Sequence, residues 1–208
     1  MHNEMNTDFT AWFDPAHWES LCHGPVQVNN RFSAQWLPQL SEHYPLNATA
    51  RLLLAADGSV TRMLEAIAQQ SLSVNILYQE DHPASGWLAN LLPQHSNATV
   101  RVRLVEICAG DAILCYAGSI LALSQLPHAM QTELHTTNLP IGRLFERHGL
   151  PLLRYSSTAD VARPRMPLPL APSMPPGPYL VRDSYLVLGQ ENVIEVRECI
   201  PLAIAGQG

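Results

Sequence analysis

The sequence has few charged residues and no long apolar run. Only 14% of its 208 residues are Asp, Glu, Lys or Arg, and the formal net charge is -6 at pH 7. A nucleic-acid-binding protein typically carries a basic patch or a recognisable helix-turn-helix, and neither is found. No run of about 18 apolar residues, the length needed to span a bilayer, is present. We therefore expect a small-molecule partner, no nucleic acid and no membrane span.

Metal-binding spacings are also missing. The chain has four cysteines and nine histidines, without a CxxC, HxxxH or HExxH motif. These spacings are the usual signature of zinc sites built by side chains, so we expect no metal. Three of the cysteines fall in apparent strands, where free cysteine acts as a small hydrophobic residue. The N-terminal residues MHNEMNTDFTAWF are acidic where a signal peptide is basic, which predicts a cytoplasmic protein.

Apolar residues make up 47% of the chain, enough for one substantial core and a single domain over residues 1–208.

Residues 101–121, RVRLVEICAGDAILCYAGSIL, predict two strands joined by a turn at Gly110-Asp111. Period-two alternation in the first strand places four side chains on one face: Arg101, Arg103, Val105 and Ile107. The second strand is almost wholly apolar, which is typical of burial on both sides. Arg103 is therefore expected to face the core.

The flanking segments alternate between helical and extended patterns. Residues 1–45 hold three tryptophans and four prolines, which indicates an N-terminal packing layer with short helices near 14–22 and 34–41. Ser59 is a plausible N-cap for a helix whose apolar residues recur at Val60, Met63, Leu64 and Ile67. Alternation predicts a strand in residues 71–79 with one face formed by Leu72, Val74, Ile76 and Tyr78. Further short helices are expected at residues 127–135 and 141–148.

Seven prolines lie between Pro164 and Pro178, so residues 156–178 are expected to form a loop or flap, either ordered or disordered. The end of the chain predicts a hairpin, with strands at 185–188 and 193–200 around a four-residue loop. One face of the last strand carries Ile194, Val196, Glu198 and Ile200. Glu195 and Arg197 are then expected to form a solvent-facing pair, and Glu198 becomes a second charge that faces the core.

Two inward charges allow two interpretations. Arg103 and Glu198 could form a buried salt bridge, since an isolated buried charge costs several kcal/mol. Alternatively they could hold opposite ends of a small apolar anion, with the guanidinium on a carboxylate and the glutamate accepting from a hydroxyl. Burial would also raise the pKa of Glu198 and make it a candidate acid or base.

The order of the motifs resembles the chorismate lyase (chorismate pyruvate-lyase) family. LLLAADGSVT precedes a helix, a strand carries Arg103, a hairpin ends in YAGSIL, LPIGR follows, and VRECIP closes the pattern, over roughly residues 50–202. The resemblance implies a single α+β domain built on an antiparallel β-sheet, with helices and flaps closing over an internal ligand cavity. It also implies a cofactor-free elimination of pyruvate from chorismate that yields 4-hydroxybenzoate.

The resemblance also assigns site residues. It implies that Arg103 fixes the ring carboxylate, provided that the turn holds one extra residue, because the match otherwise shifts to Leu104. Glu198 corresponds to the glutamate of the last strand, which would hydrogen-bond the ring hydroxyl and assist proton removal. Val60, followed by Thr61, stands where the best-known members have a flap methionine, and Ile141 stands where they have leucine. These smaller or branched residues leave the shape of the cavity, and so the substrate, open.

A second hypothesis is a binding protein without catalysis. The same fold resembles the effector-binding domain of GntR-type transcription regulators, in which a related pocket senses a small molecule. Residues 158–166, with Arg163 and Arg165, could offer a second carboxylate contact for the enolpyruvyl group. The sequence leaves open the oligomeric state, the role of the proline-rich loop and whether the product feeds ubiquinone or another aromatic metabolite.

Overall fold

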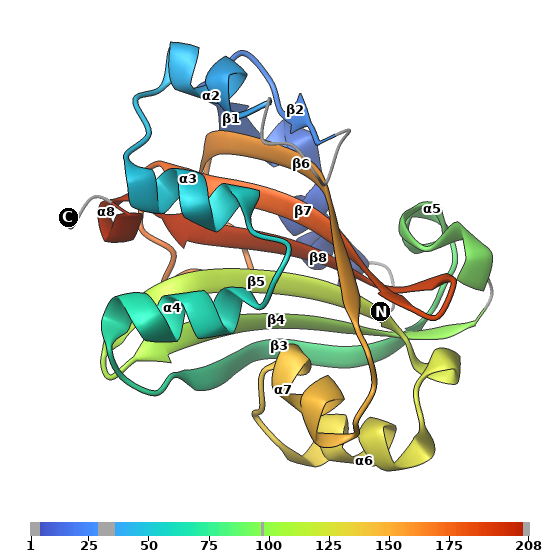
Figure 1. Cartoon of the computed structure of the whole chain (residues 1–208). Coiled ribbons are helices and arrows are strands. Elements are labelled where there is room, and N and C mark those ends of the chain that lie inside the picture. Colours follow the sequence, from blue (N-terminus) through green and yellow to red (C-terminus); the bar gives the residue numbers. More distant parts are fainter. Residues whose placement is uncertain (1–4, 29–35, 97, 206–208) are drawn as a thin grey trace.

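The computed structural model describes residues 5–28, 36–96 and 98–205 (Figure 1). The strands in chain order are β1 (Trp18–Ser20), β2 (Val26–Gln27), β3 (Ser73–Pro83), β4 (Thr99–Ala109), β5 (Ala112–Ala122), β6 (Leu153–Pro164), β7 (Tyr179–Leu188) and β8 (Glu191–Pro201). The α-helices are α1 (Met5–Phe13), α2 (Leu37–His43), α3 (Ala48–Ala55), α4 (Val60–Ala68), α5 (Trp87–Leu91), α6 (His128–Thr136), α7 (Ile141–Arg147) and α8 (Leu202–Ala205). Among the described residues, no helix is long and apolar enough to cross a membrane.

The strands form one antiparallel sheet in the order β1-β6-β7-β8-β5-β4-β3, with β2 pairing beside β1 on β6. This confirms the predicted α+β class and the single-domain architecture. The central hairpin β4–β5 turns at Gly110, whose φ of 58° lies in the left-handed region that glycine adopts without strain. The predicted final hairpin is also present, but its turn holds two residues instead of four, because Leu188 and Glu191 already pair.

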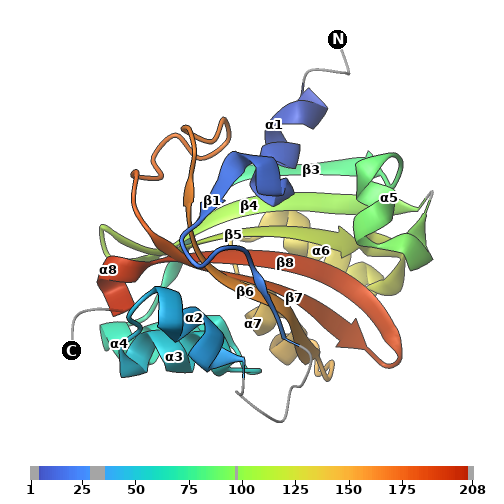
Figure 2. The same cartoon turned by 90° about the horizontal axis from the view of Figure 1, so that it is seen from above.

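Helices cover both faces of the sheet. Figure 2 shows α2, α3 and α4 on one side, and α1 with the segment that joins β6 to β7 on the other. Alternation along β4 sorts its side chains accordingly: Val105 and Ile107 pack in the core beneath α3 and α4, whereas Val102 and Leu104 pack with α1. The predicted faces of this strand are therefore confirmed.

The local signals around α4 and α7 are confirmed as well. The Ser59 side chain accepts a hydrogen bond from the backbone N–H of Arg62, so it caps α4 as the sequence predicts. Helix α7 ends two residues before Gly149, whose φ is 64°. Helix α6 occupies the position expected for residues 127–135. These short helices follow from capping and apolar spacing that is local in sequence.

The N-terminal segment differs from the prediction. In place of a helix at 14–22, a 3-10 turn (Pro15–His17) leads into β1, because Trp18 and Glu19 find backbone partners at the end of β6. The helix expected at 34–41 is found as α2, although residues 34 and 35 lie outside the described residues. The layer also packs closely: a Cβ added at Gly118 of β5 would lie 2.3 Å from Nε1 of Trp12, so only glycine fits there.

The proline-rich loop is shorter than predicted. Residues 156–164 belong to β6, because the prolines begin only where that strand ends. The rest of the segment packs against the α1 side of the sheet, where Leu168, Ala171 and Met174 are buried. Residues 168–174 therefore lie on the face opposite α3 and α4 (Figure 2), whereas residues 175–178 return to the edge of the sheet beside the start of α3.

Two predicted faces are wrong for reasons of tertiary structure. A register shift between Ile76 and Tyr78 turns the end of β3 over, so Tyr78 packs against Phe9 on the α1 side. In β8, Glu195 is buried and Arg197 donates to Asp183 at 2.7 Å and to the backbone oxygen of Trp12. Helix α1 covers the face that the sequence assigned to solvent.

Candidate functional site

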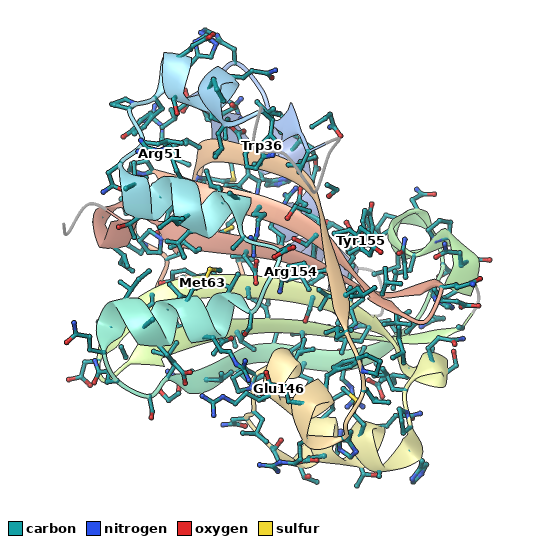
Figure 3. All side chains as sticks on the ribbon, viewed as in Figure 1. Trp36, Arg51, Met63, Glu146, Arg154 and Tyr155 are labelled. Carbon is teal, nitrogen blue, oxygen red and sulfur yellow. The ribbon has the colours of Figure 1, made fainter. Side chains whose placement is uncertain are left out.

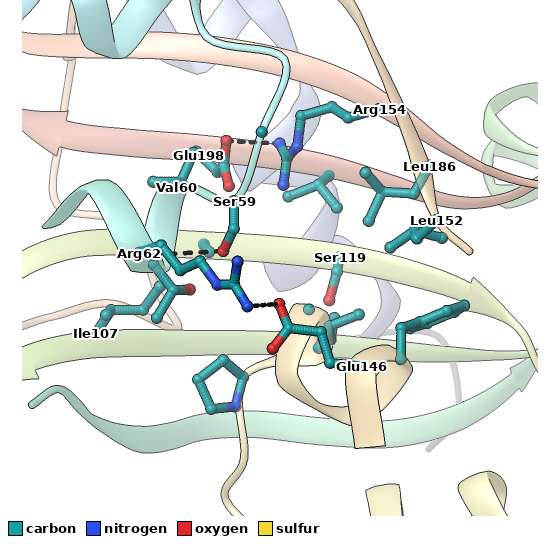
Figure 4. Close-up of a pocket in the computed structure, with 18 of the residues that line it drawn as sticks. Ser59, Val60, Arg62, Ile107, Ser119, Glu146, Leu152, Arg154, Leu186 and Glu198 are labelled. Atoms are coloured by element: carbon teal, nitrogen blue, oxygen red, sulfur yellow. Dashed lines mark hydrogen bonds and ion pairs between the residues drawn. The ribbon is translucent and has the colours of Figure 1, made fainter. Parts of the chain in front are cut away.

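A cavity of about 290 Å³ lies between the sheet and the helices α4 and α7 (Figure 4). Its floor is formed by β3, β4, β5, β7 and β8, and its cover by the loop before α4, the first turn of α4, α7 and the start of β6. The volume is near the lower end of the range that holds small organic ligands. All five residues singled out from the sequence line it: Val60, Thr61, Arg103, Ile141 and Glu198. Their roles in binding or catalysis stay predictions.

Sheet register separates the two inward charges. Arg103 of β4 pairs with Ser119 of β5, and Glu198 of β8 pairs with Ala117 of the same strand. Strands β4 and β8 thus flank β5, which places the two backbones about 10 Å apart, or two strand spacings. Of the two interpretations, the salt bridge between Arg103 and Glu198 is wrong, because Glu198 is bound by other arginines.

Arg103 is a buried cation whose charge is not balanced. Its side chain is only 1% exposed, and its Nη1 donates to the backbone oxygen of Leu139 at 3.2 Å. Its Nε and Nη2 atoms are buried and have no hydrogen-bond partner among the described residues. Desolvation, together with the nearby charge of Arg101, lowers the pKa of Arg103 to about 10, so it stays protonated at neutral pH. Arg101 itself is paired with Asp81 at 2.6 Å.

Glu198 is held by two guanidinium groups. Its Oε2 atom accepts from Nη2 of Arg182 and from Nη1 of Arg154, each at 2.9 Å. Burial alone would raise the pKa of Glu198, but the charges of Arg154 and Arg182 outweigh it and hold that pKa below its ordinary value. The expectation of a raised pKa is therefore wrong, and Glu198 is ionised at neutral pH.

Arg154 is the site residue that sequence reasoning missed. It lies in β6 near the middle of the molecule, whereas Arg51 lies at its edge (Figure 3). Its side chain lines the cavity and is 13% exposed. The signal that could have found it is an arginine that follows the apolar run LPLL, just as Arg103 stands among valines and leucines.

The two arginines considered for a second carboxylate contact lie elsewhere. Arg163 pairs with Glu19 at 2.7 Å on the outer surface, and Nε of Arg165 donates to the backbone oxygen of Trp18. Neither lines the cavity. The remainder of the proline-rich loop also contributes no residue to the lining of the cavity.

Ion pairs join the two helices that cover the cavity. Arg62 of α4 and Glu146 of α7 approach to 2.8 Å, and both side chains are largely exposed although they line the cavity. Figure 4 shows this pair crossing from one helix to the other. In a second pair the charges are exchanged between the helices, with Arg143 on α7 and Glu65 on α4. The Arg62–Glu146 pair, which lines the cavity and is exposed to solvent, therefore marks its mouth, and the second pair joins the same two helices outside the lining.

The sequence profile of a family described as "Chorismate pyruvate-lyase Rv2949c-like" matches residues 54–206, well over half of the chain. The chain belongs to this family. Curated relatives named chorismate pyruvate-lyase, from Mycobacterium tuberculosis (strain ATCC 25618 / H37Rv) and Mycobacterium bovis, are 32% identical over 103 residues. The match covers 48% of this chain and 52% of each relative, so it spans about half of their length.

Solved structures share the fold of this member of the chorismate pyruvate-lyase family. The effector domain of PhnF from Mycobacterium smegmatis has a TM-score of 0.51 at 17% identity, covering 69% of this chain and 88% of that domain. The C-terminal domain of a histidine utilization repressor from Pseudomonas syringae pv. tomato has a TM-score of 0.51 at 11% identity, covering 64% and 92%. At these identities the likeness shows the fold alone.

Proposed function

We propose that this protein is a chorismate pyruvate-lyase that eliminates pyruvate from chorismate and leaves 4-hydroxybenzoate. The observation that carries the proposal is Arg103, a buried guanidinium with two unpartnered nitrogens in a small cavity. A buried cation of this kind requires an anion, since desolvation without compensation costs several kcal/mol. The family match and the names of the curated relatives support chorismate as the source of that anion.

One end of the cavity suits the ring carboxylate. Nε and Nη2 of Arg103 form the side of the guanidinium fork that binds a carboxylate bidentately. Val60 and Thr61, the first two residues of α4, line the same cavity. The N-terminal turn of a helix carries partial positive charge, which adds to the attraction for an anion. Arg103 therefore positions the ring through its carboxylate.

The other end suits the ring hydroxyl. Because Glu198 is ionised, it acts as a hydrogen-bond acceptor for that hydroxyl and orients the carbon that bears it. Its lowered pKa makes it a weak base, so its main contribution is positional. Ile141, Val105 and Leu186 add apolar walls between the two charged ends. Such a site fixes both ends of a ring and excludes water from the bond that breaks.

The reaction balances with the substrate alone. The carbon bearing the hydroxyl loses a proton, the neighbouring ring carbon–oxygen bond breaks, and the electron pair of the lost C–H bond completes the aromatic ring. The ether oxygen becomes the carbonyl oxygen of pyruvate, and a proton is gained at the former methylene carbon. Chorismate thereby divides into 4-hydroxybenzoate and pyruvate without an oxidant or reductant. Aromatisation supplies the driving force, so we propose no cofactor.

An aromatic-acid-binding protein without turnover is the second candidate. The specific observation in its favour is the fold, which this chain shares with an effector domain and with a domain of a repressor. A pocket of this fold therefore need not be catalytic. Under this alternative Arg103 would still bind a carboxylate, but Glu198 would only select for a hydroxyl.

Incubation of the purified protein with chorismate tests the proposal, with pyruvate and 4-hydroxybenzoate measured together. We expect both products in equal amounts, and a much lower rate for Glu198→Gln with an unchanged circular dichroism spectrum. Arg163→Gln is the matched control, because Arg163 lies on the outer surface away from the cavity. Saturable binding of 4-hydroxybenzoate without any pyruvate would replace the lyase with the binding protein.

A further inference from the structure

The buried charges at the cavity do not cancel. Three guanidinium groups, those of Arg103, Arg154 and Arg182, accompany one carboxylate, that of Glu198, and all four side chains are buried or nearly so. At neutral pH the carboxylate is ionised and the guanidiniums are protonated. Among these buried side chains, two positive charges are left without a counter-charge. The other charged residues that line the cavity, Asp57, Arg62 and Glu146, are exposed to solvent. A buried excess of this size is costly unless a ligand supplies the missing negative charge.

Arg182 alone is enough to compensate Glu198. Its Nε and Nη2 both donate to Oε2 of Glu198, at 3.2 and 2.9 Å. Its Nη1 donates to the backbone oxygens of Leu53, at 3.0 Å, and Ala56. Every nitrogen of Arg182 is thus used, and its side chain does not line the cavity. Arg182 ties the glutamate to the end of α3, and its position outside the cavity lining keeps it from a ligand.

Arg154 differs from Arg182 in both respects. Among the described residues, its single hydrogen bond runs from Nη1 to Glu198, and its side chain lines the cavity. Burial and the neighbouring charge of Arg182 oppose its protonation, and the attraction of Glu198 does not offset them, so the pKa of Arg154 is lowered. A structural partner for Glu198 is already present. The cation of Arg154 therefore has capacity for a second acceptor.

Arg103 and Arg154 approach the cavity from different sides. Arg103 stands on β4, whereas Arg154 stands on β6 and reaches across β7 to Glu198 on β8. The strands β5, β8 and β7 lie between their backbones, and Leu186 and Val196 line the cavity from that interval. A single carboxylate on Arg103 leaves Arg154 unmatched. Two carboxylates on one ligand could match both.

We propose that Arg154 is a specificity-determining residue that binds the second carboxylate of a dianionic ligand whose first carboxylate binds Arg103. The identity of that second group as an enolpyruvyl carboxylate rests on the proposed function. The charge argument itself requires only a small dicarboxylate. Loss of the second carboxylate with pyruvate would then leave a monoanionic product that no longer engages Arg154.

Calorimetric binding of two stable aromatic ethers tests this inference. One is meta-(α-carboxyvinyloxy)benzoate, which carries both carboxylates, and the other is its side-chain carboxamide, which keeps the shape and lacks the second charge. Neither can gain aromaticity by losing pyruvate, so binding is measured without turnover. In the unmodified protein we expect the carboxamide to bind about tenfold more weakly or worse, the usual worth of a charged hydrogen bond.

Variants of Arg154 complete a thermodynamic cycle in which the side chain and the second carboxylate of the ligand are removed separately and together. In Arg154→Gln the two ethers should bind with similar affinity, and Arg154→Lys should restore part of the preference for the dicarboxylate. Binding of 4-hydroxybenzoate should change by less than about threefold, because a monoanion does not use Arg154. Arg163→Gln, on the same strand but outside the cavity, should leave all three affinities unchanged.

Two outcomes would overturn the inference. Equal affinity of the two ethers for the unmodified protein would mean that no cation binds the second carboxylate. This comparison uses only the unmodified protein, so it does not depend on whether a variant folds. An equal loss for both ethers and 4-hydroxybenzoate in Arg154→Gln would make Arg154 a positioning residue for Glu198. A dicarboxylate preference that depends on Arg154, in a protein that releases no pyruvate from chorismate, would keep this inference and reject the lyase.

Discussion

Arg182 and Glu198 stand directly opposite each other on β7 and β8, and two nitrogens of the arginine converge on one oxygen of the glutamate. The pair is buried, and the third arginine nitrogen holds the C-terminal end of α3. This arrangement fixes the ionised state and the direction of Glu198 before any ligand arrives. The site therefore depends on a residue that does not itself line the cavity.

Replacing Arg182 with Met should destabilise the fold strongly. The change leaves the buried Glu198 with a single cationic partner and removes donors from two backbone oxygens, so we expect a loss of about 3–5 kcal/mol in the free energy of unfolding. Urea titration followed by fluorescence measures it. Arg163→Met breaks only an exposed pair and should unfold close to the unmodified protein; equal effects in the two variants would contradict a buried role for Arg182.

Replacing Arg103 with Met should instead stabilise the ligand-free fold. The change removes a buried cation that no carboxylate of the described residues compensates, so we expect the ligand-free protein to gain stability, on the order of 1–3 kcal/mol. Binding of 4-hydroxybenzoate should be lost at the same time. Thermal unfolding with and without this acid measures both effects, and a variant that melts lower yet still binds would show that Arg103 is structural.

Glu195 makes stability depend on pH. Burial, and then repulsion by Asp183, outweigh the attraction of Arg197 and raise the pKa of Glu195 to about 8 from 4.5. Its folded form thus holds a proton that the unfolded chain releases near its ordinary pKa. The contribution of Glu195 to stability is therefore complete in acid and is lost as pH rises through about 8.

Glu195→Gln should remove this dependence. Asp160, whose pKa is raised to about 6 from 3.8, acts in a more acidic window, so the interval between about pH 6.5 and 8 separates the effect of Glu195 from that of Asp160. The unmodified protein should lose unfolding free energy across that interval, and the variant should lose much less. Urea unfolding at the two pH values gives the difference, and parallel losses would place the titrating group elsewhere.

The ion pairs between α4 and α7 should slow ligand exit. Glu146→Gln with Glu65→Gln removes both pairs while keeping the size of the side chains. Three of the four side chains, those of Arg62, Glu146 and Arg143, are about half exposed or more, and Glu65→Gln keeps a polar group at the fourth position. We therefore expect little change in stability, but a dissociation rate for 4-hydroxybenzoate that rises about two- to fivefold. Stopped-flow displacement measures it. High salt should raise the rate in the unmodified protein and not in the double variant.

Much of the fold followed from patterns that are local in the sequence. Successive side chains of a strand point to opposite faces of the sheet. The inward direction of Arg103 and Glu198 could therefore be predicted from the sequences of β4 and β8 alone. The cap at Ser59 likewise needs only its own side chain and the next turn of backbone. Where a bulge interrupts this alternation, as before Tyr78, the predicted face was wrong.

The sequence by itself determined the α+β class, the central hairpin and the two inward charges, because periodicity and capping act between near neighbours. Only the tertiary structure decided what those charges meet. Glu198 is bound by arginines 16 and 44 residues away, and these partners reverse the pKa shift that burial alone would produce. Pairing across strands sets such distances, so the cavity, Arg154 and the uncompensated charge appear only when the sheet is assembled.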